Sequence, residues 1–177
     1  MNNTLTSTNA QRVLDFLIQN PGRQLLANEI ERATKVSRAG VNFSLRKLAK
    51  EKLVIREKKA KIYLYSVDHT DPVIKQLKVL KTVSLLKPVL AKVKNFSQKM
   101  ILFGSCARGE NIPNSDIDLF ILTNSQEEVR ELIKKHSLNR KFQLVIRTPL
   151  KFAEMKNKEP VFFEEVSRGI TLCEAKE

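Results

Sequence analysis

The sequence has few cysteines and few histidines. Its 177 residues include two of each: Cys106, Cys173, His69 and His136. Two cysteines are too few for a disulfide framework, and none of these four side chains stands at the spacing of a zinc site. The scarcity excludes both kinds of site and favours the reducing environment of the cytoplasm.

Long apolar segments are also lacking. No stretch approaches the roughly 18 consecutive apolar residues that a membrane span needs. The first residues, MNNTLTSTNAQR, are polar, whereas a secretory signal needs an apolar segment there. We therefore expect a soluble cytoplasmic protein that has no membrane partner.

Acidic residues are scarce in the first part of the chain. The net charge is +13, and residues 1–70 hold 13 Lys and Arg against 6 Asp and Glu. Residues 71–99 hold 7 against 1, whereas residues 100–177 hold 12 of each sign. This one-sided balance favours a nucleic acid or another polyanion as partner of the N-terminal part, although a lysine-rich solvated surface has the same composition.

The first 70 residues have the element order of a winged helix-turn-helix domain. The predicted elements are a helix capped by Ser7 or Thr8 and ended by Asn20-Pro21-Gly22, helices at 27–33 and 37–50, and strands at 53–56 and 61–65. Residues 57–60 form the charged tip between the two strands. Helix, short helix, turn, longer helix and basic hairpin is the layout that such a domain needs.

This layout predicts which residues contact double-stranded DNA. The second helix of the pair enters the major groove, and the hairpin lies against the phosphates or the minor groove. The candidate contacts are therefore Arg38, Asn42 and Arg46 on the helix and Lys58 and Lys59 on the hairpin. The helix residues would read bases, and the lysines would supply affinity that weakens with salt. Winged helices also bind proteins, so a solvated basic face remains the alternative.

Residues 71–96 are predicted to be a helical connector. Apolar residues and lysines alternate there at helical spacing, with an interruption near Pro88. The segment either packs on both neighbouring domains or forms a dimerisation helix, so a homodimer is one alternative. A chain of this length can bury one ordinary core or two small ones, and the predicted domains are residues 1–70 and 97–177 on either side of the connector.

The residues that carry chemistry lie between positions 99 and 122. The apolar run 99–103 predicts a strand that ends abruptly at Gly104-Ser105, and a short helix and a turn follow. A second strand begins at Asp116. Because side chains alternate along a strand, Asp116 and Asp118, at its first and third positions, share one face.

These residue types suit a bound nucleotide and a divalent metal. Gly104 lets the backbone approach a phosphate closely, and Ser105 adds a hydroxyl donor beside the amides of the helix start. Asp116 and Asp118 supply hard oxygen ligands for Mg²⁺ or Mn²⁺. Arg108 can neutralise phosphate oxygens, although it fits a surface position equally well. The nucleotide-binding candidates are therefore Gly104, Ser105, Arg108 and Ser115.

The string FGSCARGENIPNSDIDLFIL resembles the signature of the DNA polymerase beta-like nucleotidyltransferase superfamily, in particular its minimal nucleotidyltransferase branch. Gly104-Ser105 precedes Asp116-Ile117-Asp118 by ten residues, which is the full family spacing. The resemblance covers residues 97–173. It implies an α+β fold with a small mixed sheet flanked by helices, and transfer of a nucleoside monophosphate from a nucleoside triphosphate, most naturally ATP.

The rest of the C-terminal sequence fits this fold but departs from the family at one position. The predicted elements are helices at 126–136, 149–157 and 160–168 and strands at 141–146 and 170–173, with Gly169 as a helix stop. Active members usually carry a third carboxylate on the later strand, where this sequence has no acid and Gln143 faces the first two carboxylates. The acids available to substitute are Glu154, Glu159, Glu164 and Glu165.

The leading interpretation is a winged helix fused to a Mg²⁺-dependent nucleotidyltransferase, with a protein, nucleic-acid or small-molecule hydroxyl as acceptor. Minimal nucleotidyltransferases are often the antitoxin half of a pair with a HEPN-domain toxin, which some silence by adding AMP. The resemblance therefore implies such a partner.

The alternative is a DNA-binding transcriptional regulator whose inactive C-terminal domain senses nucleotide or dimerises, which the missing carboxylate favours. A pure protein adaptor would leave the basic N-terminus and the carboxylate pair unexplained.

Overall fold

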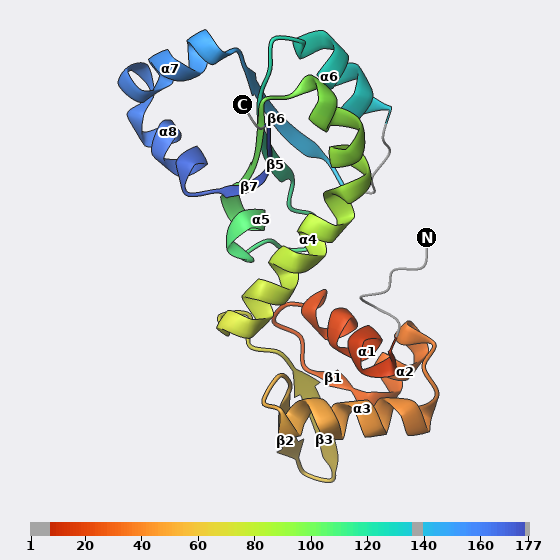
Figure 1. Cartoon of the computed structure of the whole chain (residues 1–177). Coiled ribbons are helices and arrows are strands. Elements are labelled where there is room, and N and C mark those ends of the chain that lie inside the picture. The colour runs from red at the N-terminus through yellow and green to blue at the C-terminus, as the bar shows by residue number, and fades with distance from the viewer. Residues whose placement is uncertain (1–7, 136–139, 176–177) are drawn as a thin grey trace. The chain divides into compact units, whose positions relative to one another are not determined.

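The computed structural model describes residues 8–135 and 140–175 and divides into two compact units (Figure 1). The first unit extends to Lys75 and the second begins at Gln76. The helix α4 (Pro72–Val93) contains this boundary. Within the described residues, no helix is both long enough and apolar enough to cross a membrane.

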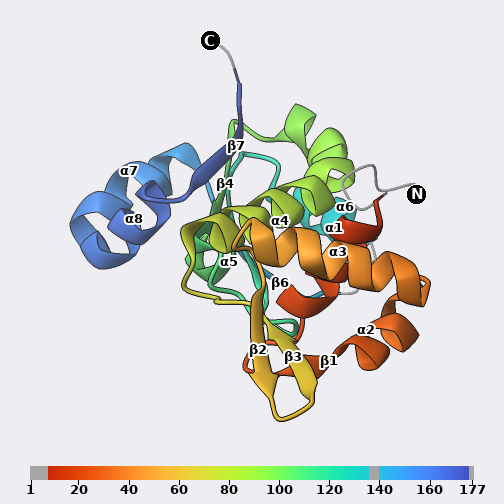
Figure 2. The same ribbon diagram turned by 90° about the horizontal axis from the view of Figure 1, so that it is seen from below.

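The first unit is a three-helix bundle with a small antiparallel sheet. Its helices are α1 (Asn9–Ile18), α2 (Ala27–Thr34) and α3 (Arg38–Lys50), and its strands are β1 (Leu25–Leu26), β2 (Ile55–Lys59) and β3 (Ile62–Ser66). The strand order is β1-β3-β2. β2 and β3 form a hairpin that extends past the helices of this unit (Figure 2).

Local signals position the helices of this unit as predicted. The Thr8 side chain accepts a hydrogen bond from the Gln11 amide, and the Gln11 side chain accepts one from the Thr8 amide, which makes a capping box. Ser37 Oγ caps α3 by accepting from the Gly40 amide at 3.3 Å. Between α2 and α3 the chain reverses at Lys35, whose φ is +56°. The apolar faces of the three helices form the core, with Leu17, Ile30 and Leu45 almost fully buried.

The hairpin differs from its predicted form. Ala60 and Lys61 alone form the turn, with Ala60 at φ +53°, and Glu57 and Lys58 pair within the ladder instead of forming the tip. A strand is held by backbone hydrogen bonds, so charged side chains that point into water do not end it. The prediction of a four-residue charged tip was therefore wrong.

The second unit is built around a four-stranded mixed sheet. In chain order its elements are α4, a 3₁₀ turn (Lys94–Phe96), β4 (Lys99–Phe103), α5 (Gly104–Arg108), β5 (Ile117–Leu122), α6 (Gln126–Lys134), β6 (Phe142–Arg147), α7 (Pro149–Lys158), α8 (Pro160–Ser167) and β7 (Ile170–Glu174). The strand order is β6-β5-β4-β7. β5 and β6 are parallel, whereas β4 is antiparallel to both of its neighbours. The α+β fold class is confirmed.

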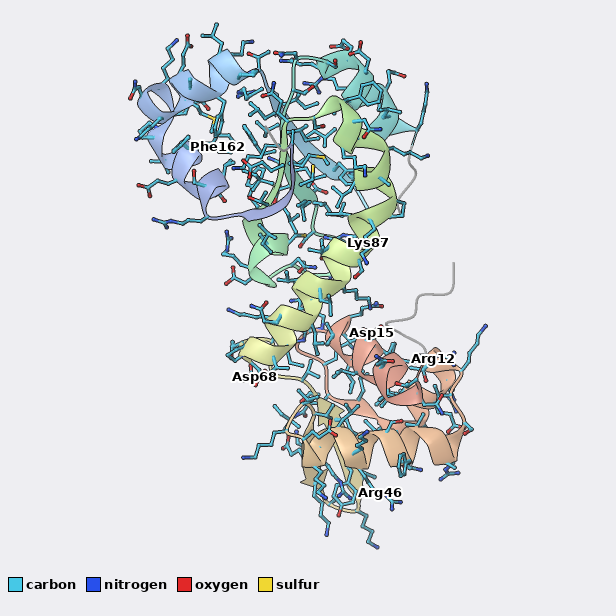
Figure 3. The ribbon with its side chains drawn as sticks, in the orientation of Figure 1. Arg12, Asp15, Arg46, Asp68, Lys87 and Phe162 are labelled. Atoms are coloured by element: carbon cyan, nitrogen blue, oxygen red, sulfur yellow. The ribbon has the colours of Figure 1, made fainter. Side chains whose placement is uncertain are left out.

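Helices cover both faces of this sheet (Figure 1). α4 and α6 pack on one face through Val89, Val93 and Val129, against Met100 and other strand residues. α7 and α8 pack on the other face through Met155, Val166 and three phenylalanines, against Ile101, Phe103 and Phe120. The ring of Phe162, labelled in Figure 3, makes an edge-to-face contact with Phe103 at a centroid distance of 5.7 Å.

Three local expectations for this unit changed or lie outside the described residues. α4 continues through Pro88 without the expected interruption, since Leu86, Val89 and Val93 are buried around it. Gly169 lies just after α8 but without a positive φ; a side chain there would lie 2.5 Å from the Leu102 carbonyl, so close approach to β4 requires glycine. The helix end predicted at His136 lies outside the described residues.

Candidate functional site

Asp118 projects from the central strand β5 toward the α7–α8 layer, and Asp116 lies just before this strand in the chain. Asp118 is the second residue of β5 and pairs with Phe103 of β4. Phe103 and Phe120 pack in the α7–α8 layer, so Asp118, which alternates in phase with Phe120, faces the same side. Asp116 precedes the strand instead of opening it, so the predicted strand position was wrong by one residue, but its charge still acts on Asp118.

Gly104 forms a tight turn directly against Asp118. Its φ is +65°, a conformation that glycine adopts at little cost. A Cβ atom at this position would overlap the Asp118 carboxylate oxygen Oδ2. The sequence therefore needs glycine here for two independent reasons, backbone conformation and space. The turn brings the Gly104-Ser105 backbone beside the carboxylates.

The electrostatics around Asp118 favour a bound cation. Partial burial raises the pKa of the Asp118 carboxyl, and the charges of Asp116 and Glu165 raise it further, while Arg108 opposes them. The carboxylate is thus in an environment with excess negative charge, which a divalent metal would relieve. Two carboxylates are also a sufficient protein contribution for Mg²⁺, which completes its coordination with water and substrate phosphates.

Arg108 lies between acidic side chains. Its Nε donates to Glu110 Oε2 at 2.8 Å, and its Nη1 lies 3.9 Å from Glu165 Oε1. The hydrogen bond to Glu110 raises the pKa of the guanidinium most, and burial acts weakly against it. Arg108 also lines a cavity between α5 and α8 with Gly104, Val161 and Glu165. The Arg108 guanidinium therefore lies next to the Gly104 turn but is already paired with carboxylates.

The loop before Asp116 is held by a residue that the sequence analysis did not identify. Arg140 donates from Nε to the Ser115 carbonyl at 3.1 Å and from Nη2 to Cys106 Sγ at 3.2 Å. Cys106 Sγ in turn contacts the Asp116 carbonyl at 3.3 Å. Ser115 Oγ accepts from the Ile112 amide at 2.9 Å, so its hydroxyl shapes this loop. These contacts orient the chain as it enters β5.

Gln143 of β6 lies opposite Asp118, at the position where the family resemblance implies a third carboxylate. The parallel register pairs it with Asp118, and its strand neighbour Val145 packs in the α7–α8 layer, so Gln143 shares the face of the carboxylates. An amide can coordinate weakly but cannot accept a proton. Across the described ranges, no group of three or more His, Cys, Asp or Glu side chains is arranged to hold a metal ion.

The four glutamates that could substitute for the missing third carboxylate have different surroundings. Glu165 of α8 lines the cavity beside Gly104 and acts on Asp118. Glu164 also lines that cavity but forms an ion pair with Arg168 at 2.9 Å. Glu154 pairs with Lys158 in α7, and Glu159 lies near Arg147 at 4.0 Å. Glu165 is therefore the substitute that the fold brings to the carboxylate pair.

In the first unit, the candidate DNA contacts lie on α3 and the hairpin. Arg38 and Arg46 are exposed on α3, and Asn42 is half-buried. Arg46 projects from the side of α3 that faces away from α1 (Figure 3). Lys58 and Lys59 are successive residues of β2 and so point to opposite faces of the hairpin.

The two hairpin lysines therefore differ in what surrounds them. Lys59 donates to Gln24 Oε1 at 2.8 Å and lies 3.6 Å from Glu57. Lys58 is paired with Tyr63 and shares its face with Arg56, whose guanidinium carbon lies 3.6 Å from the centre of the Tyr63 ring. Arg56 was not among the sequence-predicted contacts, because the predicted strand ended at this residue; only the longer β2 places Arg56 and Lys58 on one face.

Comparison with known protein families agrees with this division. Residues 83–167 match the family model described as "Nucleotidyltransferase domain", and residues 5–61 match the model described as "MarR family". The chain joins a MarR-type winged-helix domain to a nucleotidyltransferase domain. The matched part of the nucleotidyltransferase domain contains Gly104, Asp116, Asp118 and Glu165.

Among solved structures, one neighbour is weakly similar to part of this chain. This is a "putative nucleotidyltransferase" from Sulfolobus solfataricus, with 16% identity and a TM-score of 0.37. The alignment covers 55% of this chain and 85% of the other. A score this low does not establish a common fold, so the assignment rests on the family models. A search of curated proteins gave no match.

Proposed function

We propose that the nucleotidyltransferase domain transfers a nucleoside monophosphate from a nucleoside triphosphate to an acceptor hydroxyl. The observation that carries this proposal is the packing of the Gly104 turn against Asp118, on which the charge of Asp116 also acts. This arrangement supplies backbone that a phosphate can approach within reach of two hard anionic ligands. A purely structural turn would not need carboxylates at this position.

Each residue of the site has a distinct task. Asp116 and Asp118 would hold Mg²⁺, and its positive charge would offset the negative charge that develops on the phosphate during transfer. Ser105 donates its hydroxyl to a phosphate oxygen beside Gly104. Arg108 exchanges one of its acidic partners for the triphosphate. Because Gly104 and Asp118 are in direct contact, phosphate and metal sites are adjacent.

Glu165 is the proton acceptor in this proposal. The acceptor hydroxyl gives its proton to the Glu165 carboxylate, and its oxygen forms a bond to the α-phosphorus. The bond from that phosphorus to the bridging oxygen breaks, and pyrophosphate leaves with the electron pair. Glu165 suits this role because it lines the cavity beside Gly104 without completing a three-carboxylate metal site in the described chain.

The winged-helix domain, in this proposal, binds duplex DNA through α3 and the hairpin. Arg38, Asn42 and Arg46 enter the major groove, and Lys58 with Arg56 contacts the backbone. Lys59 contributes less because its ammonium group is already bonded to Gln24. The support is a solvent-exposed basic face on a helix of MarR-type fold.

The resemblance to minimal nucleotidyltransferases supports a HEPN-type protein as the acceptor and ATP as the donor. The test is transfer of labelled nucleoside monophosphate from each of the four triphosphates, with Mg²⁺, into the proteins and nucleic acids of a cell extract. The control is the double variant Asp116→Asn/Asp118→Asn, which keeps the fold and removes both anionic ligands. Label that requires the aspartates supports the transferase and identifies its acceptor.

One observation favours a second function. Gln143 stands at the position of the third carboxylate and cannot accept a proton, which suits a nucleotide-binding regulator without turnover. In that case Mg²⁺-dependent nucleotide binding persists, no label is transferred, and nucleotide alters the affinity of the winged helix for DNA. Titration of labelled duplex with and without ATP distinguishes the two functions.

A further inference from the structure

Phe43 is the most exposed large apolar side chain described in the winged-helix domain, with 73% of its surface accessible to solvent. It lies in the middle of α3, between Asn42 and Arg46. The helix caps itself through Ser37 and buries Val41, Leu45 and Leu48, so its stability does not depend on Phe43. Exposing a phenyl ring to water is unfavourable, and the fold offers no packing that compensates for it.

The surroundings of Phe43 are strongly basic. At 100° per residue, the side of α3 opposite the buried residues holds Ala39, Phe43, Arg46, Lys47 and Lys50. Ala39 lies one turn before Phe43, so the two form a small apolar spot. The sequence of α3, RAGVNFSLRKLAK, contains no acidic residue. The apolar spot is therefore surrounded by charged residues that are all basic.

This combination indicates which occupant fits the face. In a symmetric interface between two copies of the chain, the same patch meets itself, so Arg46 and Lys47 of one copy would lie against those of the other. That arrangement carries like-charge repulsion. A polyanion is attracted by the same cations. DNA additionally offers an apolar group in its major groove, the 5-methyl group of thymine.

We propose that Phe43 is a specificity-determining residue that contacts a thymine 5-methyl group in the DNA site. This inference rests on the proposed binding of DNA by the winged helix. Arg46, Lys47 and Lys50 hold α3 in the groove through phosphates, and Phe43 supplies sequence discrimination. The contact is apolar, so it adds preference for thymine over any base without the methyl group and is insensitive to salt.

The first stage of the test uses the full-length protein to enrich duplexes from a random pool at low and moderate salt. The enriched site then has each thymine replaced in turn by deoxyuridine, which removes only the methyl group. We expect one thymine whose replacement weakens binding roughly fourfold, the value for one buried methyl group. Phe43→Ala should bind the thymine duplex about tenfold more weakly and should lose the discrimination between thymine and uracil.

The matched control is Lys50→Ala, a truncation on the same side of α3. It should weaken both duplexes equally and keep the fourfold discrimination. If Phe43→Ala keeps that discrimination, or if no thymine is sensitive in the wild-type protein, the inference is overturned while DNA binding stands. If no duplex is enriched at low salt, the proposed DNA binding fails as well. If Phe43→Ala instead dissociates a dimer in sedimentation, the face is a self-interface and the inference is wrong.

Discussion

The two domains of this chain build their candidate sites in opposite ways. The winged-helix domain presents its candidate contacts as exposed side chains on one helix and one hairpin, within a region of excess positive charge. Residues 100–177, which contain the nucleotidyltransferase site, carry equal numbers of basic and acidic residues, and this site depends on contacts between the Gly104 turn, the start of β5 and α8. A single change should therefore weaken binding at the winged-helix surface without abolishing it, whereas a single change in the Gly104 turn should abolish the function of the other site.

The largest effect is expected from Gly104→Ala. The new Cβ overlaps Asp118, and the left-handed backbone is strained as well, so nucleotide transfer should fall below detection and the melting temperature should drop. The control is Gly22→Ala, which has a similar φ of +73° and no atom within 4 Å of the added Cβ. It should cost about 1 kcal/mol of stability and leave transfer intact. Equal loss of transfer in both variants would contradict the steric argument.

The next largest effect is expected from the glutamate of α8 that accepts the proton. Glu165→Gln should lower the rate of transfer about 100-fold at saturating nucleotide, because the acceptor hydroxyl loses its proton acceptor. Nucleotide affinity should change little. Glu164→Gln alters the neighbouring residue on the same helix, whose carboxylate pairs with Arg168, and should retain nearly the full rate. Similar rates for the two variants would remove Glu165 from the mechanism.

A smaller effect is expected in the winged-helix domain. Arg46→Glu replaces an attraction for phosphate with a repulsion and should weaken duplex binding roughly 30-fold at low salt, with less loss at high salt. Fluorescence anisotropy at several salt concentrations measures both values. Transfer activity should be unchanged, because this residue belongs to the other unit. Unaltered duplex affinity at every salt concentration would refute the docking of α3.

The smallest effect concerns the loop before Asp116. Arg140→Ala removes the donor to the Ser115 carbonyl and the contact with Cys106, so Asp116 should be held less firmly. Nucleotide affinity with Mg²⁺ should fall only about fivefold, roughly 1 kcal/mol, because Arg140 acts on Asp116 through the loop and makes no proposed contact with the nucleotide. Isothermal titration measures it. Arg147→Ala truncates a half-buried arginine at the opposite end of β6, near Glu159, and should have no such effect.

Local patterns predicted much of the fold. The capped helices at Thr8 and Ser37 and the two strands around Gly104 followed from periodicity and capping, which act over a few residues. The position of Gln143 opposite Asp118 was expected from the family resemblance. The register of the hairpin could not be predicted from local patterns, because the hydrogen-bonded ladder between β2 and β3 continues through charged residues. The continuation of α4 through Pro88 depends on the buried residues around it, which a propensity argument does not include.

By itself, the sequence determined the two domain types. It also determined the signature made by Gly104-Ser105 and Asp116-Asp118, because a spacing of ten intervening residues and the alternation of side chains along a strand are local features. The tertiary structure decided which other residues join them. Glu164 and Glu165 are equivalent in sequence, and only the packing of α8 on the sheet gives them different partners. Arg140 lies 25 residues from Ser115 and meets its carbonyl because β6 runs beside β5. Long-range packing brings such pairs together, and no local pattern encodes it.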